Sequence, residues 1–295
     1  MNNLYNSLLE LIIKTSCEIP EDIKQEIMIA QKKEAKASIA SKILSSILEN
    51  IQMANTNHSP ICQDTGVPIF FISGKDSSLD CLIENTADKA VKKAVSLGYL
   101  RNNSVDPIKG KALNSDNNIT RALFYFNHSE KAKKQYTEIS LLLKGGGSEN
   151  VSSQYMLPDS LLEADRSLTG VKKCILNAIL NAQGNGCAPG SAGVCIGGDR
   201  VTGFVEAKKQ FLRRADDKNP IHELQILEKE ILKLSNQLDI GPMGLGGKTT
   251  LLNCKIGSHS RHPASYFVTV SYMCWAYRRQ GIRIDSKGNI LKWLY

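Results

Sequence analysis

The order of strand-like and helix-like segments constrains the fold of this chain more than any other feature of the sequence. Apolar residues at helical spacing predict a helical lobe over residues 1–50, in which the second helix runs over 22–49. Segments of strand composition follow, and helix-like segments separate only some of them: 67–74, 121–126, 138–143, 251–255 and 266–272. Because strands and helices do not alternate strictly, the pattern favours an α+β fold over a doubly wound parallel sheet.

No repeat, low-complexity tract or clear linker divides the chain. We therefore expect a single domain over residues 1–295, with a mixed or antiparallel sheet flanked by helices. The carboxy-terminal residues, 280–295, predict a hairpin whose two strands, 282–284 and 290–293, turn at Lys287 and Gly288.

The composition predicts a cytoplasmic protein. Hydrophobic residues make up 42% of the chain and charged residues 22%, and no window approaches the roughly 18 consecutive apolar residues of a membrane span. The amino terminus lacks a basic region followed by an apolar one, so we expect no secretory signal. In a reducing compartment the eight cysteines are expected to be ligands or buried side chains rather than disulfides.

The net charge of +8 comes from basic residues that are scattered along helix-like segments and mixed with acidic ones. Nucleic-acid binding favours clustered lysine and arginine with interleaved aromatic residues, so we expect no nucleic-acid partner and no membrane partner. The simplest interpretation of the charge is a solvated basic surface, and the same field would favour an anionic substrate.

Three cysteines stand in separate, loop-like settings, and none of them belongs to a CxxC pair. Cys62 lies in a polar turn closed by Gly66, Cys187 lies between glycines, and Cys274 follows a predicted strand. Thiolates from separate loops can bind one iron–sulfur cluster, and three ligands for four irons would leave one iron open for chemistry. Taken alone, a cysteine is more often a small buried side chain. That is the role we expect for Cys17, Cys81, Cys174, Cys195 and Cys254.

Asp64 and His262 are the candidate proton-handling residues. A histidine beside an aspartate is held in one tautomer and can shuttle protons near neutral pH. A capping or core role before Pro263 is the alternative for His262. Two features suit a carboxylate: successive glycine N–H groups at 145–147 can cradle it, and Arg101 can bind it bidentately. The alternatives are a flexible loop and an exposed arginine.

The segment 241–250 has the look of a phosphate-binding loop. The Walker pattern requires a glycine where Pro242 stands, and a preceding strand where this chain has a helix-like segment. The pattern therefore argues against nucleotide binding through Lys248, and its glycines are expected to allow a close approach of the backbone to another part of the structure.

Five segments, taken together and in order, resemble the class I, iron–sulfur fumarate hydratase and L(+)-tartrate dehydratase family. They resemble its alpha subunit, or the amino-terminal catalytic part of its fused enzymes, and the match spans roughly residues 53–279. The segments are ICQDTG at 61–66, KGGGSEN at 144–150, CAPGSAGVCIGG at 187–198, GPMGLGGKTT at 241–250 and RHPASYFVTVSYMCWAYRR at 261–279.

The resemblance implies an oxygen-sensitive [4Fe–4S] cluster, with Cys62, Cys187 and Cys274 as its ligands. The open iron would act as a Lewis acid in a reversible dehydration. Asp64 and His262 would then form a proton relay. The substrate's carboxylates would be held by Gln63, Arg101, Gly145, Gly146 and Gly147. One segment departs from the family's pattern, because Ala188 replaces a proline and Cys195 a glycine, which leaves Cys195 open as a competing ligand.

The resemblance also implies a partner. Only a short hairpin follows Arg279, which is too little for the family's beta domain, so we expect a separate beta subunit in an α2β2 heterotetramer. The favoured reaction is fumarate plus water to malate, by a hydro-lyase. The first alternative is the alpha subunit of an L(+)-tartrate dehydratase that forms oxaloacetate, and the more distant one is a non-catalytic iron–sulfur scaffold or sensor.

Overall fold

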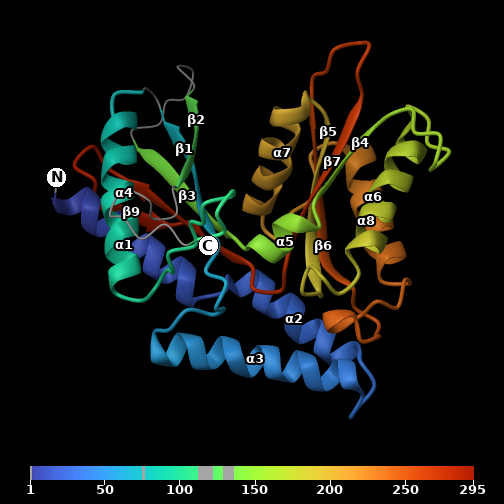
Figure 1. Cartoon of the computed structure of the whole chain (residues 1–295), viewed down its shortest axis with the longest axis horizontal. Coiled ribbons are helices and arrows are strands. Elements are labelled where there is room, and N and C mark those ends of the chain that lie inside the picture. The colour runs from blue at the N-terminus through green and yellow to red at the C-terminus, as the bar shows by residue number, and fades with distance from the viewer. Residues whose placement is uncertain (1, 75–76, 112–121, 129–135) are drawn as a thin grey trace. The chain divides into compact units, whose positions relative to one another are not determined.

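The computed structural model describes residues 2–74, 77–111, 122–128 and 136–295 (Figure 1). These residues form two compact units, each built from segments that are separated in the sequence. The first unit contains Met1–Pro20, Asn50–Gly146 and Arg278–Tyr295, and the second contains Glu21–Glu49 and Gly147–Tyr277. Each unit has one mixed sheet flanked by helices, so the predicted α+β class is confirmed. The extent of the domains stays a prediction.

The sheet of the first unit has the strand order β2-β1-β3-β8-β9. Its strands are β1 (Val67–Gly74), β2 (Leu123–His128), β3 (Thr137–Lys144), β8 (Arg278–Ile284) and β9 (Ile290–Trp293). β1 runs parallel to β2 and antiparallel to β3, and β3 runs antiparallel to β8. β8 and β9 pair as the hairpin that the sequence predicts. The start of the predicted strand at 121 lies outside the described residues.

Two helices cover this sheet, α1 (Asn2–Cys17) and α4 (Asp80–Ser96), and they also pack against each other (Figure 1). The apolar stripe of α1, including Leu8, Leu11 and Ile12, is buried against sheet residues such as Phe70 and Ile139. Burial of aliphatic and aromatic side chains at about 25 cal/mol per Å² is the main stabilising contribution in such a core.

The strand directions bring three segments of the first unit to one edge of its sheet. β1 begins just after the turn 62–66, β3 ends at Lys144, and β8 begins at Arg278. The register joins them, because Val67 pairs with Lys144 and Leu143 pairs with Arg278. We call this end of the sheet the Asp64 edge; it comprises residues 62–66, 144–145 and 278.

The sheet of the second unit has the strand order β4-β7-β5-β6. Its strands are β4 (Ser153–Met156), β5 (Gly190–Gly197), β6 (Leu251–His259) and β7 (Phe267–Met273). All eight residues of the central strand β5 are buried, as expected for a strand that is covered on both faces. In Figure 1, α7 (Arg200–Lys209) covers one face, and α6 (Leu168–Ala182) and α8 (His222–Ser235) cover the other.

The predicted helix over 22–49 is wrong in one respect, because it is broken. α2 spans Glu21–Lys33 and α3 spans Ile39–Asn57, with Ala37 at a φ of 64° between them. Glu34, the first residue after α2, is buried and turned toward the segment 248–249, which competes with continuing the helix. A short helix, α5 (Gly146–Asn150), follows β3.

Three loops of the second unit meet at one edge of its sheet. β5 begins after Cys187, β7 ends before Cys274, and β6 begins after the segment 241–250. The register again joins them, because Ser191 pairs with Met273 and Gly190 pairs with Leu251. We call this end the Cys187 edge; it comprises residues 184–189, 241–250 and 274–275.

Among the residues described, no helix combines the length and the apolar character that crossing a membrane requires.

Candidate active site

The Asp64 side chain is held at one oxygen and left open at the other. The Gly66 N–H donates to Oδ1 at 3.0 Å, and an Arg278 Nη1–H donates to the main-chain carbonyl of Asp64. None of the described residues donates a hydrogen bond to Oδ2. Gly66 has a φ of +77°, and a methyl group added there would lie 2.9 Å from the Lys144 backbone, so this turn requires glycine. The carboxylate is therefore fixed in direction and retains an oxygen for a proton.

Thr65 brings Arg101 to the same edge. The buried Thr65 hydroxyl oxygen accepts hydrogen bonds from the Arg101 backbone N–H at 3.0 Å and from Asn103 Nδ2 at 3.2 Å. The Arg101 and Gln63 side chains are exposed. The structure thus unites the predicted Asp64 and Arg101, with the Arg101 side chain accessible to a bound anion.

Only the first glycine of the 145–147 turn packs closely. A methyl group added at Gly145 would lie 3.0 Å from Asp64 Oδ2 and 3.4 Å from Arg278 Nη2. Gly146 begins α5, and a methyl group at Gly147 would meet nothing within 4 Å. Glycine at 145 therefore gives the Asp64 carboxylate its space.

Cys62 is presented on a turn whose backbone is anchored. The preceding residue, Ile61, is buried; its N–H donates to the Ser16 carbonyl at 3.0 Å, and its carbonyl accepts from Asn50 Nδ2 at 2.9 Å. The Cys62 thiol itself is partly exposed and free of any disulfide. The local structure therefore offers a thiol to a ligand without burying it.

The Cys187 loop is held by main-chain hydrogen bonds to both neighbouring loops. The Cys187 carbonyl accepts from the Trp275 N–H at 3.2 Å, and the Ala188 carbonyl accepts from the Met243 N–H at 2.8 Å. Cys187 is exposed and has a φ of 55°, a conformation that non-glycine residues adopt only where their surroundings impose it. Cys274, beside Trp275, is partly exposed. The two cysteines therefore belong to one connected group of loops.

Tyr272 explains the glycines around Cys187. Its buried ring lies very close to this loop. A methyl carbon added at Gly186 would lie 2.5 Å from a ring atom, and one added at Gly190 would lie 2.3 Å from a ring atom. Glycine at these two positions therefore leaves the space that the tyrosine ring occupies.

The Tyr272 hydroxyl is buried, with the Gly190 N–H close to its oxygen, and its O–H donates to none of the residues that the structure describes. Burial raises the pKa of Tyr272, and the neighbouring thiols of Cys274 and Cys187 raise it further. The hydroxyl is thus a donor beside both sulfurs, and leaving such a group unsatisfied costs about 1–3 kcal/mol.

The phosphate-loop-like segment 241–250 already binds carboxylates of the protein. Glu34 Oε1 accepts from the N–H groups of Lys248 and Thr249 at 2.8 and 3.1 Å, and Asp239 Oδ1 accepts from the Gly247 N–H at 3.1 Å. These are the N–H groups that would hold a phosphate, so the arrangement argues against nucleotide binding. Their role is to shape the loop that supports Cys187.

A comparison of the whole chain with protein families now decides its relationship. The model of the family described as fumarate hydratase (fumerase) matches residues 5–283. The chain belongs to the fumarate hydratase family. A putative class I fumarate hydratase of Geobacillus stearothermophilus is 46% identical over 299 residues, which cover 100% of this chain and 58% of that relative. This chain therefore spans little more than half of that relative's length.

Two further family relatives have nearly the same length as this chain. A putative L(+)-tartrate dehydratase subunit alpha of Methanocaldococcus jannaschii is 35% identical over 95% of this chain and 98% of the relative. The L(+)-tartrate dehydratase subunit alpha of Escherichia coli (strain K12) is 28% identical over 97% of this chain and 92% of the relative. The family predicted from the five segments is confirmed.

The structure does not bring His262 to the Cys187 edge. It lies in the loop between β6 and β7, exposed, where its Nδ1 accepts from the Ala264 N–H at 3.1 Å. β7 begins after this loop and ends before Cys274. Its 7 residues separate the two ends of the sheet by about 20 Å. Within the second unit, His262 is therefore remote from both cysteines.

The remaining cysteines divide into two groups. Burial raises the pKa of Cys17 and Cys174 to about 11 and that of Cys195 to about 12, and burial also raises the pKa of Cys254. These thiols are neutral near pH 7 and suit packing, as predicted. Cys81 is the exception, because it is exposed on α4, where its sulfur accepts from Asn85 Nδ2.

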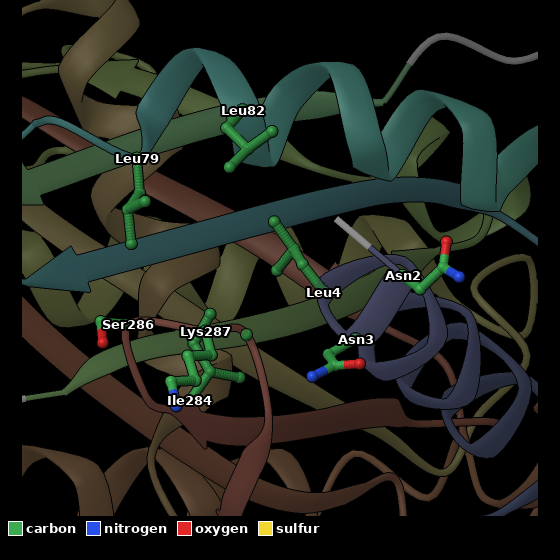
Figure 2. Close-up of a pocket in the computed structure, with 9 residues that line it drawn as sticks. Asn2, Asn3, Leu4, Leu79, Leu82, Ile284, Ser286 and Lys287 are labelled. Atoms are coloured by element: carbon green, nitrogen blue, oxygen red, sulfur yellow. The ribbon is translucent and has the colours of Figure 1, made fainter.

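Within the described ranges, no group of three or more His, Cys, Asp or Glu side chains is gathered as a site for a metal ion. A pocket of about 610 Å³ lies in the first unit, at the opposite edge of the sheet from Asp64. Figure 2 shows Leu4, Leu79, Leu82 and Lys287 among its lining residues, and none of the predicted site residues lines it.

Three residues that shape the two edges were not found by sequence reasoning: Arg278, Tyr272 and Glu34. Arg278 and Tyr272 lie within the segment 261–279, so the signal was their place beside Cys274. Glu34 lies in a run of mixed charges that gives no such signal.

Proposed function

We propose that the chain is the alpha-type subunit of a [4Fe–4S]-dependent hydro-lyase that interconverts fumarate and malate. The observation that carries the proposal is Asp64, a carboxylate with one oxygen fixed and the other open, two residues from the accessible thiol of Cys62. The 46% identity to a relative named as a class I fumarate hydratase supports the choice of reaction.

We propose Cys62, Cys187 and Cys274 as the cluster ligands. They are thiols on anchored loops with some exposure, whereas Cys195 is buried and burial raises its pKa, which argues against it as a competing ligand. The Tyr272 O–H, which donates to none of the described residues, fits a group that accepts hydrogen bonds near Cys187 and Cys274. When bound, such a cluster supplies a Lewis-acidic iron for the substrate's hydroxyl and carboxylate.

The protein's own part begins with Asp64. Its Oδ2 would accept a proton from the attacking water during hydration of fumarate and would return that proton to the leaving hydroxyl of malate during dehydration. The proton on the adjacent carbon would be exchanged with a base that the proposed beta subunit supplies. The Gly66 N–H keeps the carboxylate from turning away. Arg101, with Gln63 and the N–H groups of 145–147, would bind the substrate's carboxylates. His262 stays the predicted partner of Asp64 in the relay, although its distance from Cys187 and Cys274 weighs against this part of the proposal.

A separate beta subunit, in an α2β2 assembly, belongs to the same proposal. The two relatives of matching length are named as alpha subunits, and this chain covers 98% and 92% of them. The class I relative is much longer than the segment matched here. A cytoplasmic location, where thiols stay reduced, completes the proposal.

The second candidate is an L(+)-tartrate dehydratase alpha subunit. The names of relatives at 35% and 28% identity favour it, and the higher identity to the fumarate hydratase weighs against it. Fumarate and tartrate chemistry differ by one hydroxyl, which a few polar groups can discriminate.

The test is strictly anaerobic purification of the chain, alone and co-expressed with a beta-type chain. We expect about four iron and four sulfide per chain, and turnover of malate by the co-expressed form. Asp64→Asn should keep the iron and lose turnover, whereas a scaffold or sensor would keep its response. His262→Asn tests the relay in the same assay. No iron after anaerobic reconstitution would end the proposal, and faster turnover of tartrate would select the second candidate.

A further inference from the structure

Arg278 is a buried cation without an acidic partner in the described part of the chain. It is 1% exposed, and none of the described residues accepts a hydrogen bond from its Nε. No carboxylate oxygen of the described residues lies within ion-pair distance of its guanidinium. Its one hydrogen bond to those residues goes from Nη1 to the Asp64 carbonyl. Burying an unpaired charge is costly, so a position that keeps one calls for an explanation beyond packing.

Arg283, five residues further along β8, shows the ordinary arrangement. Its Nε donates to Glu138 Oε1 at 2.8 Å, and its guanidinium lies 4.5 Å from the centre of the Tyr136 ring. The Arg283 charge is paired with a carboxylate and its guanidinium plane stacks on a ring, so a structural role explains this arginine. The two arginines share a strand and differ in their partners, which makes Arg283 a matched control.

The guanidinium of Arg278 joins two parts of the Asp64 edge. One nitrogen holds the Asp64 carbonyl, and Nη2 lies against Gly145, which in turn lies against Asp64 Oδ2. The cation binds the carbonyl rather than the carboxylate. Oδ2 is therefore left open while the residue that bears it is held in place.

We propose that Arg278 is a positioning residue for Asp64, and that its unpaired charge attracts an anionic dicarboxylate to the Asp64 edge. This inference rests on the proposed function for its substrate. The positioning role and the attraction of the substrate can be tested separately. Lysine at 278 keeps the positive charge but lacks the planar guanidinium that positions Asp64, whereas methionine lacks both.

The kinetic test compares Arg278→Lys, Arg278→Met and Arg283→Lys in the co-expressed, anaerobic enzyme. Arg278→Lys should lower kcat by roughly 10- to 100-fold with KM near the wild-type value, because a misplaced catalytic group costs on this order. Arg278→Met should lower kcat and also raise KM for malate. Arg283→Lys should change neither. A rise in KM alone for Arg278→Lys, or equal effects at the two arginines, would overturn the positioning role.

A second measurement does not depend on activity. In the metal-free full chain, hydrogen–deuterium exchange of peptides covering 61–66 and 144–150 should become faster in Arg278→Ala and stay unchanged in Arg283→Ala. Added guanidinium ion should restore protection in Arg278→Ala, because it fills the vacated site. Unchanged exchange in Arg278→Ala would sink the inference even if the enzyme turns over malate. If exchange is faster in Arg278→Ala but the wild-type enzyme does not turn over malate, the positioning role of Arg278 is supported and the proposed function is not.

Discussion

The Asp64 edge and the Cys187 edge solve the same local problem by different means. Both hold loops at the ends of antiparallel strands. At the Asp64 edge, side chains do the holding: an arginine on a carbonyl and a threonine hydroxyl on a backbone N–H. At the Cys187 edge, main-chain hydrogen bonds and the fit of Tyr272 against two glycines do it. Charged and polar side chains therefore fix the first edge, and close packing of a ring against glycines fixes the second.

The largest expected effect is loss of the cluster. Cys62→Ser, Cys187→Ser and Cys274→Ser should each abolish iron binding, measured as iron and sulfide per chain after anaerobic purification, because a cubane needs its thiolates. The exposed Cys81→Ser is the control and should keep its iron. If the first three lost only folding stability and retained iron, the ligand assignment would be withdrawn.

Reactivity toward an alkylating reagent should distinguish the proposed ligand Cys187 from the buried Cys195 without any iron. In the metal-free chain at about pH 8, an alkylating reagent should modify the exposed Cys187 and spare Cys195, whose pKa burial raises to about 12. Mass spectrometry of tryptic peptides would locate the label.

A shape-based edge should be intolerant of one added methyl group. Gly190→Ala would force a carbon to 2.3 Å from the Tyr272 ring, and we expect a loss of about 3 kcal/mol in unfolding free energy, the upper end for overpacking. Gly147→Ala meets open space and should change stability by less than about 0.5 kcal/mol. Denaturant midpoints measure both. Equal stabilities would mean that the ring moves freely aside, and the edge would not be controlled by shape.

The Glu34 carboxylate accepts two of the backbone hydrogen bonds that hold the segment 241–250 of the Cys187 edge, so removing it tests how far side chains contribute there. Glu34→Ala leaves the N–H groups of Lys248 and Thr249 without their acceptor, and should cost about 2 kcal/mol. Glu34→Gln retains an oxygen acceptor and should cost less. The same denaturation experiment decides, and a larger loss for glutamine than for alanine would contradict this account.

The smallest expected effect is that of Tyr272→Phe, which should be neutral or favourable for the metal-free chain and unfavourable for the surroundings of a bound cluster. In the metal-free chain Tyr272→Phe removes a buried hydroxyl that donates to none of the described residues, so stability should be unchanged or rise by up to about 1 kcal/mol. In the iron-loaded protein the same change should make the cluster's reduction potential more negative, because a donor to its sulfurs is lost. Tyr155→Phe, which loses a hydrogen bond to Asn177, should cost about 1 kcal/mol in both forms. An unchanged potential would remove Tyr272 from the cluster's surroundings.

Much of the fold was open to sequence reasoning where composition and burial agree. The strand predicted over 67–74 is β1, and the segments 138–143 and 266–272 are β3 and β7 within a residue or two. β5 was missed, because Gly190–Gly197 is rich in small residues with weak strand preference. Only its pairing with β6 and β7 on both sides makes it a strand.

For the candidate site, the reactive residues could be predicted from the sequence, but the residues that hold them in position could not. Cys62, Asp64, Cys187 and Cys274 carry chemistry that is legible in a sequence, and the segments around them identify the family. Arg278 and Glu34 were not legible, because each acts through a backbone group of a residue far away in the chain. A hydrogen bond of that kind leaves no local spacing to detect.

By itself, the sequence determined the α+β class, the family and the thiols and carboxylate on which a hydro-lyase proposal rests, since these follow from side-chain chemistry and local periodicity. Only the tertiary structure decided how these groups are held. Strand register placed Arg278 on the Asp64 carbonyl, and close packing gave two glycines to Tyr272. It also put His262 at the far end of the β-sheet from Cys187 and Cys274, because strand direction, not sequence distance, sets which ends of strands meet.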